Sequence, residues 1–230
     1  MAKKGSGIFL VYVDIDAKHD KEFNDWYNCE HLPELLAVPG ILSAARYVSV
    51  KGGPKYLACY EFENVGVLRT PAFTNRPRTP WGQRVSPSVI GSNLTRIAGD
   101  QIFPDATEMP DRGMAPVLQI GRMSVPAEVE AEWNGWYNGE YIPGYRKVPG
   151  VIYARRYRVH EGTSAYTTVY EFANAAGVEA SKSALIAAFA AHAGCDDPCS
   201  GIARRLYPDR SLRAHRETAR MPIDSMEGPR

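Results

Sequence analysis

The feature of the sequence that most constrains its fold is an internal repeat with an offset of 110 residues. Residues 22–40 read EFNDWYNCEHLPELLAVPG, and residues 132–150 read EWNGWYNGEYIPGYRKVPG. The register holds without a gap, so the sequence indicates a fused duplication of one structural unit. The positions that recur unchanged 110 residues later are Glu22, Asn24, Trp26, Tyr27, Asn28, Glu30, Pro33, Val38, Pro39, Gly40, Ala44, Arg46, Tyr47, Tyr56, Tyr60, Glu61, Phe62 and Asn64.

Each copy has the same expected order of strands and helices. In copy one, the apolar run 7–15 predicts a strand, and Phe23, Tyr27 and His31 at i, i+4 and i+8 predict a helix over 20–32. Two further strands, 41–50 and 55–63, follow, with the VPG and KGGP turns before each. A second helix, shortened or distorted by four prolines, is expected within 70–88, and a closing strand within 93–105.

Copy two repeats this pattern, with an amphipathic helix over 178–194 and a last strand over 201–209. The expected fold class is therefore α+β, with two ferredoxin-like βαββαβ units. A four-stranded sheet with helices on one face leaves the other face bare, and the sibling sheet can cover it. The expected divisions are residues 1–110 and 111–210 for the two halves and 211–230 for a polar tail.

The stretches WYNCEHLPELLAVPGILSAARY and WYNGEYIPGYRKVPGVIYARRY resemble the W-Y-x-x-E-H-[LI]-P pattern of EthD-like proteins, in the dimeric α/β-barrel superfamily. The resemblance covers most of both copies. It implies a barrel of two ferredoxin-like units, here within one chain, with a pocket between sheet and helices. The superfamily includes muconolactone isomerases, monooxygenases, polyketide cyclases and haem-handling enzymes, so the resemblance predicts the fold far better than the chemistry.

Composition excludes several classes of function. The chain has 230 residues, 44% of them hydrophobic, and its 27 Lys and Arg nearly balance 26 Asp and Glu. This indicates no nucleic-acid or acidic-membrane surface. No apolar stretch approaches the roughly 20 residues needed to cross a bilayer, and no nucleotide-binding glycine motif follows a strand. We expect a cytoplasmic protein that binds a small hydrophobic or aromatic molecule. A homo-oligomer is compatible with the sequence.

Comparison of the two copies distinguishes residues expected to have a structural role from residues expected to react. Trp26, Glu30 and Arg46 recur in copy two, so we expect a structural set in which Arg46 pairs with the carboxylate. His31 differs, because its counterpart is Tyr141. An imidazole titrates near neutrality and can take and give a proton, whereas a phenol mainly donates a hydrogen bond. The expected catalytic residues are therefore His31 and Tyr141, with helix-end hydrogen bonding as the alternative role of His31.

Aromatic and polar residues around this pair form the expected substrate site, since tyrosines suit a flat aromatic ligand with a few oxygens. Arg155, which replaces Ala45, is expected to meet an anionic ligand group or to face solvent. The expected substrate-binding residues are Trp26, Tyr27, Asn28, Tyr47, Tyr60, Arg155 and Tyr157.

The sequence predicts no cofactor and no metal. His192, Cys195 and Cys199 lie close together, but their spacing is not a usual zinc spacing and a fourth ligand is missing. Cys29 beside His31 could form a nucleophilic pair, although adjacent helix positions diverge.

The leading functional hypothesis is a cofactor-independent lyase, isomerase or cyclase that moves a proton on an aromatic or polyketide-like compound. The alternatives are a cofactor-free monooxygenase, a non-catalytic carrier of a hydrophobic ligand, and a haem protein with His31 as the axial ligand.

Overall fold

The computed structural model describes residues 5–105, 113–178, 199–205 and 210–211 of the chain. Its α-helices are α1 (Asp20–Trp26), α2 (Leu32–Leu36), α3 (Pro71–Thr74), α4 (Pro80–Val85), α5 (Pro87–Ile90), α6 (Glu130–Trp136) and α7 (Ile142–Tyr145). Its strands are β1 (Gly7–Ile15), β2 (Ile41–Lys51), β3 (Tyr56–Phe62), β4 (Gly91–Phe103), β5 (Val117–Met123), β6 (Val151–Glu161), β7 (Tyr166–Phe172), β8 (Cys199–Arg205) and β9 (Arg210–Ser211).

The strands close into an antiparallel barrel. Hydrogen-bonded neighbours follow the order β2-β3-β1-β4 in the first half of the chain and β6-β7-β5-β8 in the second. Strand β4 pairs with β6 and strand β8 pairs with β2, so the two sheets are joined at both seams. The sequence predicts two sheets that face each other. The structure adds that backbone hydrogen bonds join the edges of the two sheets. The short strand β9 also pairs with β2.

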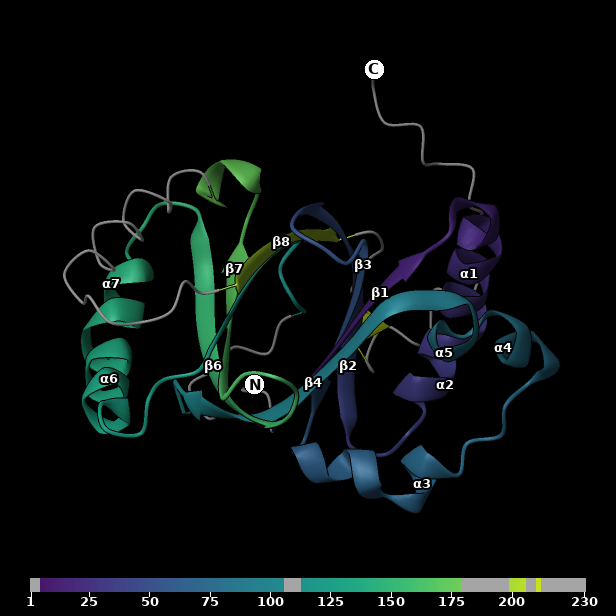
Figure 1. Cartoon of the computed structure of the whole chain (residues 1–230), viewed down its shortest axis with the longest axis horizontal. Coiled ribbons are helices and arrows are strands. Elements are labelled where there is room, and N and C mark those ends of the chain that lie inside the picture. Colours follow the sequence, from purple (N-terminus) through teal and green to yellow (C-terminus); the bar gives the residue numbers. More distant parts are fainter. Residues whose placement is uncertain (1–4, 106–112, 179–198, 206–209, 212–230) are drawn as a thin grey trace.

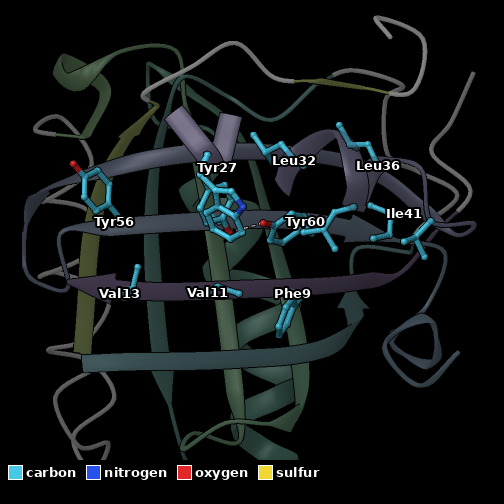
Figure 2. Close-up of a cluster of buried hydrophobic side chains, with 14 of the residues drawn as sticks. Phe9, Val11, Val13, Tyr27, Leu32, Leu36, Ile41, Tyr56 and Tyr60 are labelled. Atoms are coloured by element: carbon cyan, nitrogen blue, oxygen red, sulfur yellow. Dashed lines mark hydrogen bonds between the residues drawn. The ribbon is translucent and has the colours of Figure 1, made fainter. Parts of the chain in front are cut away.

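Helices cover the barrel on two sides, with α1 to α5 beside the first half and α6 and α7 beside the second (Figure 1). Strand β1 shows why both of its faces are apolar. Ile8, Leu10 and Tyr12 pack inside the barrel, whereas Phe9 and Val11 pack beneath the helices (Figure 2). Because the strand is buried on both faces, it reads as a continuous hydrophobic run instead of an alternating one.

The first helix of each half contains a π-helical turn, Tyr27–His31 in one and Tyr137–Tyr141 in the other. In each, the N–H after the turn bonds five residues back, Leu32 to Tyr27 and its counterpart Ile142 to Tyr137. In both halves a proline lies two residues after the end of this turn, Pro33 in one and Pro143 in the other. It has no N–H, and its ring would crowd the carbonyl four residues back, so a wider turn accommodates it.

The proline-rich segment 70–88 forms three short helices, each beginning with a proline. Proline suits the first position of a helix, where its missing N–H would have no partner in the helix. Thr70 and Thr79 cap the first two helices by accepting the Phe73 and Gly82 N–H groups. The single distorted helix expected here is thus divided into three pieces. The corresponding helix expected over 178–194 lies almost wholly outside the described residues, as does the expected tail beyond residue 211.

Within the described part of the chain, no helix is long and apolar enough to cross a membrane. The division at residues 110 and 210 stays a prediction.

Candidate functional site

A cavity of about 470 Å³ lies between the first half's sheet and its helices. The cavity is lined by residues of β1 and β3, by the α1–α2 segment and by residues between 68 and 88. Its volume falls within the range of small-molecule sites. The lining includes the apolar or aromatic Phe9, Val11, Trp26, Tyr27, Leu35, Tyr60, Leu68 and Phe73, and the polar Glu30, His31, Glu34, Arg76, Arg78, Thr79 and Arg96.

His31 ends the π turn and lines this cavity. Its ring stacks on the Trp26 indole, with centroids 4.6 Å apart, and meets the Tyr27 ring edge-on at 4.8 Å. Burial lowers the pKa of His31 to about 3, assisted by the positive charges of Arg76 and Arg46. The expectation that this group titrates near neutrality is therefore wrong, because the imidazole is neutral at pH 7 and remains so well into acid.

Glu30 does not pair with Arg46, contrary to the sequence prediction. Its Oε1 accepts hydrogen bonds from the Trp26 indole N–H at 2.7 Å and from the Thr79 hydroxyl at 2.5 Å. Thr79 also accepts the Gly82 N–H that starts α4. The carboxylate is satisfied by neutral donors, and it ties the proline-rich wall of the cavity to the helix that carries His31.

Arg46 has a different structural role. Its guanidinium donates to Asn28 at 3.0 Å and to Asn24 at 2.8 Å, and it lies 4.2 Å from the Tyr27 ring centroid. In the second half, Arg156 likewise donates to Asn138 and lies over Tyr137. Both arginines are therefore held by amide oxygens and aromatic faces. The Asn28 side chain, expected to bind substrate, serves this arrangement.

Tyr27 and Tyr60 join their hydroxyls at 2.5 Å on the cavity side of the sheet (Figure 2). Burial raises the pKa of both hydroxyls, that of Tyr60 well above its ordinary value. They remain neutral at any physiological pH. Tyr137 and Tyr170 form the same pair at the same distance in the second half.

Three residues expected at the substrate site lie inside the barrel instead. Tyr47 donates to the Ala115 carbonyl at 2.9 Å, and Tyr157 is fully buried in the same interior cluster. Arg155, only 2% exposed, forms ion pairs with Glu61 and Glu171. None of the three lines the cavity. Barrel closure turns these strand positions inward, so they stabilise the interface between the halves.

Tyr141 lies in the other half of the chain, away from His31. It is buried, it packs against Trp136, Tyr137 and Tyr145, and burial raises the pKa of its hydroxyl far above the ordinary value. The structure does not bring the two expected catalytic residues into one cavity.

The structure describes only one of the two cysteine sites considered from the sequence, the one at Cys29. Cys29 is an exposed free thiol, and no described hydrogen bond joins it to His31. His192, Cys195 and the side chain of Cys199 lie outside what the structure describes. Among the described residues, no group of three or more His, Cys, Asp or Glu side chains could hold a metal ion.

Sequence reasoning missed Arg76, Glu34 and the wall around them. Arg76 lies in the proline-rich segment, and the residue 110 positions later is Ile186. The loss of similarity between the two copies over this segment was the available signal, because a wall that has diverged from its counterpart is where one copy can acquire its own chemistry.

Comparisons with known proteins indicate the fold. No protein-family model matches the chain, and no curated protein matches its sequence. Among solved structures, a monooxygenase-like protein from Lactobacillus acidophilus is 11% identical with a TM-score of 0.58, covering 87% of this chain and 94% of its own. An anthrone oxidase-like protein is 13% identical with a TM-score of 0.57, covering 92% and 95%.

A haem-binding protein from Thermus thermophilus is 10% identical with a TM-score of 0.57, covering 92% of this chain and 94% of its own. Chlorite dismutases are also similar in structure. At such low identity the likeness concerns the fold alone. The chain shares with these proteins a mixed α+β fold, and in this chain the antiparallel strands close into a barrel.

Proposed function

We propose that this protein is a cofactor-independent enzyme in which His31 removes a proton from a small aromatic or polyketide-like substrate. The observation that carries the proposal is a neutral imidazole at the wall of a cavity lined by aromatic and charged side chains. A neutral imidazole is the form that accepts a proton, and the substrate anion that forms beside it favours the imidazolium and offsets the low pKa of His31 in the empty cavity. General bases contribute about 10²- to 10⁴-fold to rate. A C–H or O–H bond of the substrate breaks, its electron pair passes to the substrate oxygen, and the proton goes to His31.

The leading outcome of this step is a lyase, isomerase or cyclase reaction, in which the proton returns at another atom. Such a reaction needs an acid as well as a base. Glu34 lies three residues after His31 and lines the same cavity. Burial, and then the charge of Glu30, raise the pKa of the Glu34 carboxyl. A carboxyl group here can accept the proton from His31 and pass it to a second substrate atom, so Glu34 is the proposed proton carrier.

Cofactor-free oxygenation is the second candidate, favoured by the monooxygenase-like and anthrone oxidase-like structures. Here the substrate anion passes its electrons to dioxygen. A CH₂ group becomes a carbonyl group, and the second oxygen atom leaves as water. The proton abstraction is the same in both candidates, and only the fate of the anion differs.

Haem fits the residues of this cavity poorly, although a similar structure binds it. The His31 ring lies flat on Trp26 and edge-on to Tyr27. A metal-ligating histidine normally donates its second N–H to a carboxylate or carbonyl. In the part of the chain that the structure describes, no hydrogen bond of this kind is made by His31. No step of the mechanism proposed here involves haem.

The proposal also includes the family of the chain and the origin of its two halves. The chain is proposed to be an EthD-like protein whose two barrel halves arose by duplication. The matching of element bounds supports this, since β3 and β7, α1 and α6, and the two π turns are each offset by 110 residues. The active cavity lies in the first copy, and Tyr141 is a packing residue of the second.

The test is hydrogen exchange in D₂O without oxygen, using anthrone, whose CH₂ group is acidic. The wild-type protein should accelerate deuterium uptake at that carbon, and His31→Gln should reduce the acceleration by about 10²- to 10⁴-fold. Tyr141→Phe is the matched control and should behave as wild type. Oxygen consumption on readmitting air then separates oxygenation from isomerisation. Binding without exchange would support a non-catalytic carrier, and exchange unchanged in His31→Gln would refute the assigned base.

A further inference from the structure

The guanidinium of Arg76 is held in position at the cavity, and no residue that the structure describes serves as its counterion. It is half-buried and lines the cavity. Its Nη1 donates to the Phe73 carbonyl at 2.5 Å, and its Cζ lies 4.2 Å from the Phe73 ring centroid. Among the described residues, its other donors have no hydrogen-bond partner and no carboxylate forms an ion pair with it. The side chain is therefore fixed while most of its hydrogen-bonding capacity is unused.

The groups around Arg76 indicate which kind of ligand could accept its unused hydrogen bonds. Burial lowers the pKa of Arg76, while Tyr60 and Glu34 act in the opposite direction. Arg76 in turn disfavours a proton on His31. A cation partly removed from water favours an anionic oxygen as its partner, and a guanidinium can donate two parallel hydrogen bonds to it. An oxygen in this position would lie close to the proposed base.

The other arginines of the cavity are different. Arg78 and Arg96 are exposed, and neither shows the half-buried setting of Arg76. Water solvates exposed cations well, so they attract an anion weakly and lose this attraction in salt. This contrast singles out Arg76 and also supplies a matched control within the same cavity.

We propose that Arg76 binds the substrate oxygen that becomes negative when His31 removes the proton, and that the substrate is a neutral aromatic ketone or phenol. This rests on the proposed function. A carboxylate already bound to Arg76 would pair with the cation before the proton is removed, so this pairing would not be specific to the transition state. A neutral carbonyl or hydroxyl oxygen gains its charge only during the reaction. It meets the cation fully only as charge develops, which is the condition for accelerating the step.

The test uses para-nitrophenol, whose neutral and ionised forms differ in colour, as a probe of charge preference that needs no turnover. Titrating the bound probe should show ionisation at lower pH than in water for the wild-type protein. Arg76→Met should shift the ratio of phenolate to phenol affinity by about tenfold or more towards the neutral form. Arg78→Met should leave the ratio near that of wild type. Arg76→Lys should restore part of the preference, and it serves as the folded substitute should Arg76→Met not fold.

The outcomes separate this inference from the proposed function. An unchanged ratio in a folded Arg76→Met protein, or an equal loss in Arg78→Met, would overturn the role of Arg76. Faster deuterium exchange into an anthrone carboxylate than into anthrone itself would overturn the assigned substrate class. His31→Gln should retain the preference for phenolate. If His31 proves not to remove a proton, the role of Arg76 in binding the phenolate therefore still stands. If the preference for phenolate is absent, the role of His31 as the base is unaffected.

Discussion

Replacing Arg155 by alanine should destabilise the protein strongly, because it removes the cation that pairs with two buried carboxylates. Arg155 is 2% exposed, and its Nη2 lies 2.8 Å from Glu171 while its Nη1 contacts Glu61. Burial opposes its charge, yet Glu171, Tyr157 and Glu61 hold the pKa of Arg155 well above its ordinary value. Ser43 donates to Glu61 and the Ala115 N–H donates to Glu171, so each carboxylate keeps one neutral partner.

Breaking a buried ion pair by removing one partner costs about 3 to 5 kcal/mol. For a chain of this size, that loss lowers the melting temperature by about 6 to 20 °C. The loss should shrink in acid. Without the cation, burial raises the carboxyl pKa values of the folded variant above the ordinary value of about 4.3, so the folded state binds protons more readily than the unfolded chain. The variant's stability relative to wild type should then rise as the pH falls from 7 towards 5.

The assay is urea unfolding at a series of pH values, with two matched controls. Arg158→Ala removes an exposed pair with Glu130 and should change stability little at any pH. Arg155→Met combined with Glu61→Gln and Glu171→Gln removes the charges together and should recover much of the loss. Wild-type stability of Arg155→Ala at neutral pH, or a deficit that does not change with pH, would refute the argument from buried charge.

Four further predictions concern His31, two tryptophans and Thr79. Because the pKa of His31 is about 3, protonation of His31 should not lower kcat/KM as the pH decreases through 6.5. A decrease of kcat/KM at that pH that is absent in His31→Gln would contradict the low pKa of His31. Between pH 6.5 and 3 the unfolded chain protonates at His31 and the folded chain does not, so acid should destabilise wild type more than His31→Gln in urea titrations. Trp26→Ala should cost about 3 to 5 kcal/mol, and Trp136→Ala less because Trp136 is only partly buried; equal melting temperatures would contradict this. Thr79→Val should lose a helix cap worth about 1 kcal/mol and the bond to Glu30, weakening the binding of para-nitrophenol without changing its preference for the phenolate.

The alternation of elements in each half was readable from the sequence because it depends on local patterns. Apolar runs, the Phe23, Tyr27 and His31 stripe, and the VPG turn all act within a few residues. The π turn was not readable in that way. Pro33, two residues beyond the turn, suggests only that the helix is interrupted, since a break and a widened turn both relieve the same crowding.

The partners of the charged residues depend on tertiary structure, and here the sequence predictions were wrong. Arg46 and Glu30 looked complementary, but the π turn and the proline-rich wall bring Thr79 to Glu30 and asparagines to Arg46. Arg155 looked exposed or ligand-facing. Glu61 and Glu171, each within a YEF sequence in an apolar strand, were the signal for buried carboxylates in need of a cation.

Under the proposed duplication, the ion-pair cluster inside the barrel explains how one chain can hold a single active cavity. Glu61 and Glu171 are related by the 110-residue offset, and one arginine serves both of them. Two identical chains could supply two such arginines or none, because symmetry repeats every residue. Only copies that differ can place arginine at 155 and alanine at 45. Under the proposed duplication, the same freedom allows His31 and Arg76 in one copy and Tyr141 and Ile186 in the other, so proton transfer requires only the first copy to keep a reactive cavity.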